Sequence, residues 1–258
     1  TTVDDLLVNT LNLEYHPNLM ATAGDSALAV ASGPQPSSNQ LQALCDEWFI
    51  QSPDLLSDRN ADGKVNFTDY ALAAKSGFIL VVEGAIPTGS DGAFCEIGGG
   101  MTMVDAMAKF GAAASQIIAV GACAAYGGIP AGSPNPTQAL SVEQALGHLG
   151  IQKPVINIAG CPIHPDWLVG TIIDLLTGQS IALDAYKRPL KFFPEKKIHD
   201  ACPFKGTGEA SALGKGGCLK ELGCRGPKTH ADCHVRKWNN PAAGQVGVNW
   251  CIAAGTPC

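Results

Sequence analysis

Short apolar runs alternate with helical patterns along the first 190 residues of the chain. Four runs, each bounded by glycine or proline and rich in β-branched residues, predict buried parallel strands, and they lie at residues 11–15, 78–82, 116–120 and 154–158. Helical periodicity predicts one helix from Thr102, one from Ser141, and one that ends at Gly178. Because strand alternates with helix, the pattern favours an α/β fold with a doubly wound parallel sheet.

The periodicity disappears after about residue 187. The remaining chain is rich in glycine, proline and asparagine and cannot bury a core of its own through helices or strands. We therefore expect an α/β domain over residues 1–187, followed by a loop-rich domain over residues 188–258 that covalent or metal bonds organise.

Composition narrows the classes of function. The net charge of −6 argues against a protein that binds duplex nucleic acid, because no basic surface dominates. No apolar run approaches the roughly 20 residues of a transmembrane helix. Six of the ten cysteines fall in the last 57 residues, which agrees with a second domain built around its cysteines.

Two cysteines follow predicted strands at equivalent positions. Cys123 and Cys161 each come three residues after a strand end, in glycine-flanked turns. Ligands of open α/β sheets bind beyond the carboxyl ends of the strands, so the two thiols can converge on one bound group. A single such cysteine would more often be a small buried residue, but two in matching positions favour a site.

One imidazole and three thiols cluster in the loop-rich part. His199 is followed by Cys202, and Cys218 is followed five intervening residues later by Cys224. Zinc would accept this set, but its usual cysteine pairs have two to four intervening residues. Disulfides would leave His199 without a role. An iron–sulfur cluster tolerates wider spacing and is modestly favoured, while all three options stay open on spacing alone.

Six stretches, in order, resemble the small, electron-transferring subunit of nickel–iron hydrogenases. They read VEGAIP, AVGACAAYGGIP, NIAGCPIHPDW, RPLKFFPEKKIHDAC, CLKELGCRGPKTHADC and WNNPAAGQVGVNWC. The resemblance runs from about residue 11 to residue 258, apart from residues 34–76, which read as an insertion. It implies a flavodoxin-like first domain and a chain of three iron–sulfur clusters.

The resemblance also implies partners. The nickel–iron or nickel–iron–selenium site would lie in a larger partner subunit, and this chain would bind no nickel. Electrons would leave to an external redox protein such as a cytochrome c. The family further implies a periplasmic location.

The resemblance assigns a cluster to eight of the ten cysteines. It places Cys123 and Cys161 at the proximal 4Fe–4S cluster, His199, Cys202, Cys218 and Cys224 at the distal 4Fe–4S cluster, and Cys233, Cys251 and Cys258 at the medial cluster. At Cys251 many members have proline and a three-iron cluster, so a thiol there resembles the nickel–iron–selenium branch and implies a fourth iron. An imidazole ligand should raise the potential of the distal cluster, and we expect His199 near the surface. Cys45 and Cys95 have no assigned role.

Two parts of the family pattern are missing from these residues. The family has a C-x-x-C pair just after its first strand and another cysteine shortly after the position of Cys258. The proximal set therefore has two of four ligands and the medial set three of four. We expect missing ends rather than lost clusters.

A second metal signal lies inside the insertion. Residues 58–69 match the spacing of an EF-hand-type calcium loop and resemble one loop of a dockerin repeat. The expected ligands are Asp58, Asn60, Asp62, Lys64 through its carbonyl, Asn66 and Asp69. The modest affinity of a single such loop is useful outside the cytoplasm and is a second reason to expect the periplasm.

Two other functions compete with a hydrogenase subunit. One is a secreted calcium-binding scaffold or adhesion module whose C-terminal cysteines form disulfides. The other is the related cluster-bearing subunit of NADH:quinone oxidoreductase, which would lack the segment after Arg188.

Overall fold

The structure is a computed structural model that describes residues 78–98, 101–239 and 246–258. Contacts divide these residues into two units, one ending at Pro162 and one beginning at Ile163. The predicted strand at residues 11–15 and the calcium loop at residues 58–69 lie outside the described residues.

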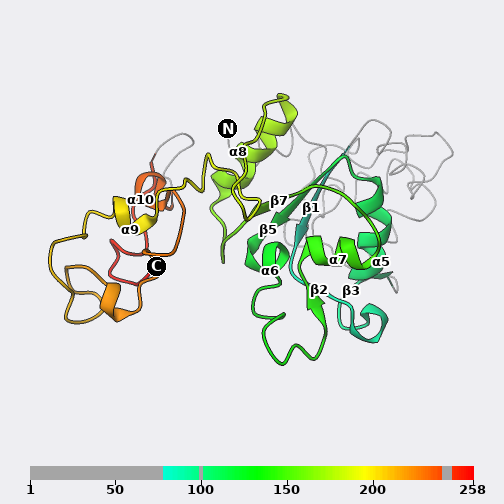
Figure 1. The fold of residues 1–258 in the computed structure, drawn as a ribbon, viewed down its shortest axis with the longest axis horizontal. Helices are drawn as coiled ribbons and strands as arrows, with labels where there is room; N and C mark the ends of the chain where they lie inside the picture. Colours follow the sequence, from blue (N-terminus) through cyan, green and yellow to red (C-terminus); the bar gives the residue numbers. More distant parts are fainter. Residues whose placement is uncertain (1–77, 99–100, 240–245) are drawn as a thin grey trace, which may run out of the picture. The chain divides into compact units, whose positions relative to one another are not determined.

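A three-stranded parallel sheet forms the centre of the first unit (Figure 1). Its strands are β1 (Ile79–Glu83), β5 (Gln116–Val120) and β7 (Val155–Ile158), in the order β1-β5-β7. Val82 pairs with Ala119, and Ala119 pairs with Asn157. The apolar runs predicted these three strands to within one residue, since both faces of β5 and β7 are largely buried.

Two short antiparallel ribbons accompany the sheet. Strand β2 (Ile86–Pro87) pairs with β6 (Ala139–Leu140), and β3 (Glu96–Gly98) pairs with β4 (Met101–Thr102). A short 3-10 turn, η2 (Gly89–Gly92), connects the two ribbons.

Helices α5 and α7 begin where the sequence predicts. Helix α5 (Met103–Ala106) starts after Thr102, whose hydroxyl accepts a hydrogen bond from the Asp105 backbone N–H. It continues as the π-helical turn η3 (Met107–Gly111). Helix α7 (Val142–His148) has the same reciprocal capping arrangement at Ser141 and Gln144.

Helix α6 (Gly121–Tyr126) was not predicted. It starts directly after β5 and ends at Gly127, which has a φ of 87°. Such a left-handed residue is a common helix terminator because glycine has no Cβ. Cys123 therefore lies on a helix, where the sequence suggested only a turn.

The core of the first unit lies between the sheet and α5, α6 and α7. Its fully buried members include Ile117, Ala119, Ala124, Val142 and Val155. These come from the sheet and from the helices that follow its strands. Because this core packs against the sheet, it holds in place the carboxyl ends of β5 and β7, from which α6 and the loop after β7 begin.

The second unit has few regular elements. They are α8 (Pro165–Leu176), α9 (Ile198–Ala201), the 3-10 turn η4 (Lys220–Leu222) and α10 (Cys233–Arg236). Among these, α8 alone has more than two helical turns. None of the described helices is long and apolar enough to cross a membrane.

Hydrogen bonds join α8 to α10. The Trp167 indole N–H donates to Asp232 at 2.8 Å, and Arg236 bonds both Asp232 and Asp166. These contacts explain why α8 groups with the C-terminal unit, although the sequence pattern assigns it to the first domain. The proposed domain boundary at residue 187 reflects periodicity rather than contacts and stays a prediction.

His164 has a structural position at the start of α8. It is almost fully buried, its Nδ1 accepts from the Asp166 backbone N–H, and its Nε2 lies 2.8 Å from the Lys237 carbonyl. Because a carbonyl only accepts, Nε2 is the donor in this hydrogen bond. Both ring nitrogens therefore form hydrogen bonds with the backbone.

Candidate iron–sulfur sites

Helix α6 and the loop after β7 bring Cys123 and Cys161 to the same edge of the sheet. The strand ends Val120 and Ile158 are paired, and each cysteine follows three residues later. The Ala122 N–H donates to the Gly160 carbonyl at 2.7 Å, which joins the helix to the loop one residue before each thiol. Cys161 is exposed and Cys123 half-buried, so a bound group could reach both.

Gly128 closes one side of this site. Its φ is +56°, and a Cβ added to it would lie 2.6 Å from the Cys123 Sγ and 2.9 Å from the Cys123 Cα. The backbone at Gly128 thus packs directly on the cysteine. The sequence signal was the paired glycine of AYGGIP, whose role in placing Cys123 we did not predict.

We expect Gly128→Ala to displace the Cys123 thiol and to lower the iron bound at this site. The left-handed backbone alone costs about 1–2 kcal/mol for a residue with a Cβ. The matched control is Gly150→Ala, because Gly150 has a φ of +70° but open space around it. Iron analysis and the EPR spectrum of the reduced protein compare the two variants. Equal iron in both would contradict the packing argument.

His199 and Cys224 meet at Gly226. The backbone N–H of His199 donates to the Gly226 carbonyl at 3.0 Å, and the Gly226 N–H points to the Cys224 Sγ at 3.4 Å. A Cβ on Gly226 would lie within 4 Å of both residues. The Gly226 backbone therefore links the two predicted distal ligands through these two hydrogen bonds.

Cys202 and Cys218 belong to the same neighbourhood. Burial raises the pKa of the Cys202 thiol, and charge interactions with the nearby Cys218 and Cys224 raise it further. Cys218 is held by its N–H, which donates to the Gly208 carbonyl at 2.7 Å. The structure thus gathers the thiols that the sequence assigned to a distal site, and His199 lies beside them, half-buried.

The three predicted medial cysteines also come together. Burial and the nearby Cys251 thiolate raise the pKa of Cys233 to about 11. The Cys251 and Cys258 side chains share a hydrogen bond, which lowers the pKa of Cys251 to about 6 and raises that of Cys258. The Cys258 thiol therefore stays protonated and donates the hydrogen bond to the Cys251 sulfur.

The two groups of thiols adjoin each other. The Cys258 backbone N–H points to the Cys224 Sγ at 3.4 Å, and the Arg225 N–H donates to the Cys258 carbonyl at 2.9 Å. The Cys258 backbone thus contacts the distal set, while its thiol bonds Cys251 of the medial set.

The chemistry of these donors fits iron–sulfur clusters. Neighbouring thiolates repel each other, so a half-buried group of them is stabilised by a cationic centre. In the described residues, no group of three or more Cys, His, Asp or Glu could hold a single metal ion, and all nine described cysteines are free thiols. A cluster binds each ligand through a different iron, so its ligands need not converge on one point.

The imidazole of His234, next to Cys233 in the sequence, also indicates a bound group at the medial site. The Nδ1 of His234 is inaccessible to solvent and has no hydrogen-bond partner among the described residues, and its ring lies 6.2 Å from that of Trp250. Trp250 directly precedes Cys251. A sulfide-bearing group at the medial site would offer such a nitrogen an acceptor.

Cys95 lies apart in sequence and in environment. It is half-buried between η2 and β3, and burial raises the pKa of its thiol. Its backbone carbonyl accepts a hydrogen bond from the Met103 N–H at 2.8 Å. Cys45, like the calcium loop, lies outside the described residues.

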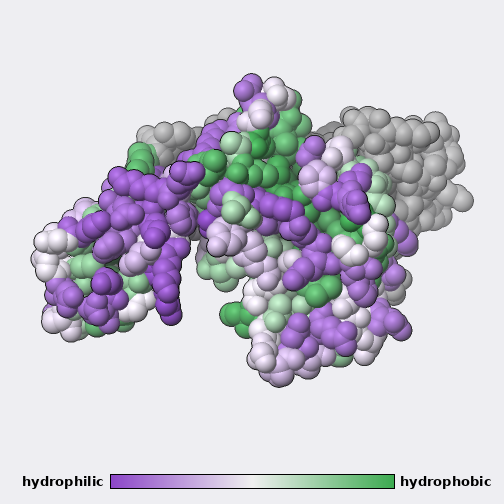
Figure 2. Space-filling model, in the orientation of Figure 1, coloured by the Kyte–Doolittle hydropathy of each residue, from purple (hydrophilic) through white to green (hydrophobic). Residues whose placement is uncertain are grey.

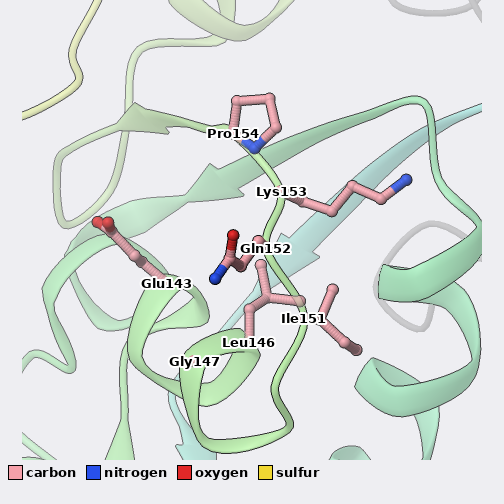
Figure 3. Close-up of a pocket in the computed structure, with 7 residues that line it drawn as sticks. All are labelled: Glu143, Leu146, Gly147, Ile151, Gln152, Lys153 and Pro154. Carbon is pink, nitrogen blue, oxygen red and sulfur yellow. The ribbon is translucent and has the colours of Figure 1, made fainter.

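A pocket of about 420 Å³ in the first unit is separate from these thiols (Figure 3). Its lining consists of Glu143, Leu146, Gly147, Ile151, Gln152, Lys153 and Pro154. The Lys153 ammonium donates to the Ala114 carbonyl at 2.7 Å, which fixes that side chain structurally. The lining residues include neither Cys nor His, so the pocket is not part of a cluster site.

Two family models match the chain. Residues 1–175 match "NADH ubiquinone oxidoreductase, 20 Kd subunit", and residues 195–258 match the C-terminal part of the "NiFe/NiFeSe hydrogenase small subunit". The periplasmic [NiFeSe] hydrogenase small subunit of Desulfomicrobium baculatum is 33% identical over 270 residues, which cover 97% of this chain and 72% of that protein. The chain belongs to the hydrogenase small subunits.

Other relatives and solved structures agree. The periplasmic [NiFe] hydrogenase small subunit 1 of Nitratidesulfovibrio vulgaris is 34% identical, with 99% of this chain and 69% of that protein covered. The reduced, active Ni-Fe-Se hydrogenase of Desulfomicrobium baculatum has a TM-score of 0.75, covering 99% of this chain and 83% of that one at 33% identity. The recombinant [NiFeSe] hydrogenase of Desulfovibrio vulgaris Hildenborough has a TM-score of 0.72 at 36% identity, covering 100% and 83%.

Membership in this family decides between the competing functions. Hydrogenase small subunits are the electron-transfer subunits of heterodimeric nickel–iron hydrogenases, they carry iron–sulfur clusters, and they pair with a large subunit. The chain is therefore part of an oxidoreductase that acts on hydrogen. The match over residues 195–258 covers the segment that the NADH:quinone oxidoreductase alternative would lack.

Proposed function

We propose that this small subunit relays electrons through three 4Fe–4S clusters between a nickel–iron or nickel–iron–selenium site in the large subunit and an external carrier such as a cytochrome c. The proposed ligands are Cys123 and Cys161 for the proximal cluster, His199, Cys202, Cys218 and Cys224 for the distal cluster, and Cys233, Cys251 and Cys258 for the medial cluster. The clusters supply one-electron chemistry when bound, and the chain holds and separates them.

The contact between Cys258 and Cys224 is the observation that carries this proposal. It supports a direct passage from the medial to the distal cluster, because a ligand of one touches a ligand of the other. The proximal pair at the end of the parallel sheet would complete the series. Its position agrees with the edge at which open α/β sheets bind ligands. We also propose a flavodoxin-like fold for that domain, and the adjacent parallel strands support it.

His199 is proposed as the ligand at the electron exit. Its ring makes no hydrogen bond with the described part of the chain and is half-buried, so one nitrogen can bind iron while the ring edge reaches solvent. A neutral imidazole in place of a thiolate makes the cluster less negative and raises its potential. Electrons therefore collect at the distal cluster.

Hydrogen itself provides the test of this function. The heterodimer, prepared without oxygen, should show brown cluster absorption that hydrogen gas bleaches and an added cytochrome c restores. A protein that oxidises hydrogen without any change in this absorption would contradict the relay.

We also propose one Ca²⁺ at residues 58–69, on sequence grounds alone. Three carboxylates, two amides and a carbonyl are the hard oxygen ligands that Ca²⁺ prefers, and Gly63 allows the turn of such a loop. This proposal, together with the periplasmic names of the relatives, supports a periplasmic location.

Calcium titration of the chelator-treated heterodimer should give one binding event with Kd of roughly 10⁻⁴–10⁻³ M. The Asp58→Ala/Asp62→Ala double variant should lose it, because two of the three carboxylates are gone. Equal binding by the double variant would remove both the site and the part of the localisation argument that depends on it.

A further inference from the structure

The chain around the distal ligands is basic, although the whole protein is acidic. Between residues 195 and 228, seven lysines and arginines face four carboxylates, all of them exposed, whereas the complete chain has a net charge of −6. In Figure 2 the lobe that holds α9 is covered largely by hydrophilic residues. Charge rather than apolar area therefore dominates this surface.

Three of these cations lie around His199. Backbone hydrogen bonds from Ile198 to Thr229 and from His199 to Gly226 place α9 beside the 225–229 turn. Lys197 comes two residues before His199 on one side, and Arg225 and Lys228 flank Gly226 on the other. We call Lys197, Arg225 and Lys228 the basic rim. All three are exposed.

The acid that directly follows His199 pairs mainly with a lysine outside the basic rim. Asp200 forms an ion pair with the Lys205 ammonium at 3.0 Å, and this hydrogen bond lowers the pKa of the Asp200 carboxyl, with further help from Lys197. Within the described ranges, the three members of the basic rim have no ion-pair partner. Their charges remain directed to solvent.

We propose that the external electron carrier is a small redox protein that docks over His199 with an acidic face. This inference rests on the proposed function, because it takes the distal cluster as the electron exit. Complementary charge increases the rate of encounter and orients the partner, while a small electron-transfer interface stays weak enough for rapid release. In each encounter one electron leaves the reduced distal cluster and reduces one oxidised carrier, and no bond is made or broken.

The test uses one haem protein with two opposite charges. Basic cytochrome c and the same cytochrome after succinylation of its lysines serve as acceptors for the hydrogen-reduced heterodimer. We expect the acidic, succinylated form to be reduced at least about 10-fold faster at low salt, with a rate that falls as NaCl is added, because salt screens the attraction.

A triple variant then tests the basic rim itself. Lys197→Glu/Arg225→Glu/Lys228→Glu should reverse the preference for the two cytochromes. Lys109→Glu is the control, because Lys109 is an exposed lysine on η3 in the other unit. Iron content and the isotope exchange between H2 and D2O, which needs no external acceptor, should stay unchanged in both variants.

The outcomes separate the two levels of the proposal. Faster reduction of the basic cytochrome by the unmodified heterodimer, or a triple variant that keeps the original preference, would overturn the acidic-carrier inference alone. A heterodimer that contains no iron–sulfur clusters, or that reduces neither cytochrome, would overturn the relay as well.

Discussion

Cys224→Ala should abolish electron delivery to a protein carrier while leaving the hydrogen chemistry of the large subunit intact. Cys224 is the thiol on which the distal and medial sets converge, since both the Gly226 and the Cys258 N–H groups point to its sulfur at 3.4 Å. Loss of a direct ligand should exceed the about 10- to 100-fold cost of losing an outer-shell partner of a metal site. We therefore expect carrier reduction to fall by more than about 100-fold and the distal iron to be lost.

Cys95→Ala is the matched control for this experiment. It removes an equally half-buried thiol that has no proposed cluster, so iron content and carrier reduction should both be retained. Isotope exchange between H2 and D2O should persist in both variants. A Cys224→Ala protein with full iron and an unchanged rate would show that Cys224 is not a ligand.

Cys251→Pro should convert the medial cluster from a four-iron to a three-iron centre. The Cys251 thiol lies in the medial set, where it shares a hydrogen bond with Cys258 and influences Cys233. Among the described backbone hydrogen bonds, none has the Cys251 N–H as donor, so a proline, which lacks that group, removes no such bond. The oxidised variant should show a new three-iron EPR signal and about one iron atom fewer per chain.

Cys251→Ala distinguishes the thiolate from the backbone. Alanine keeps the N–H and removes only the sulfur, so it should give the same three-iron signal. A signal in the proline variant alone would assign the change to backbone distortion, and a signal in neither would show that Cys251 does not bind iron.

The sheet was predictable because its strands are apolar on both faces. Ile117, Ile118 and Val155 are buried, and a continuous β-branched run has that meaning in a parallel sheet. Helix α6 was not predictable in the same way. Its six residues are too short for a periodic pattern, and the glycines at its two ends suggested a turn.

The cluster ligands were recognisable from motifs, whereas their mutual contacts were not. Spacing alone left zinc and disulfides as alternatives for His199 and the three cysteines near it. Only the surrounding sequence stretches resembled the hydrogenase small subunits. The approach of Cys258 to Cys224 spans 34 residues, and the one helix among the described residues of that span is the single turn α10. The path includes the positive-φ residues Lys237, Asn239 and Gly255, and local sequence does not specify how such turns add up.

The steric role of Gly128 was likewise hidden in the sequence. Gly128 is an ordinary member of a glycine-rich chain until the structure places the Cys123 sulfur 2.6 Å from a Cβ built at this position. Close packing of backbone on a ligand thiol depends on contacts between separate turns. The spacing of a motif predicts which residues are ligands, but it does not predict which glycine must pack against a ligand.

Iron and acid-labile sulfide analysis of the purified heterodimer tests the central claim most directly. Three 4Fe–4S clusters predict about twelve iron atoms and about twelve sulfides assigned to this subunit, with no zinc and no disulfide. A protein that contains zinc or disulfides at these cysteines, and no acid-labile sulfide, would contradict the account.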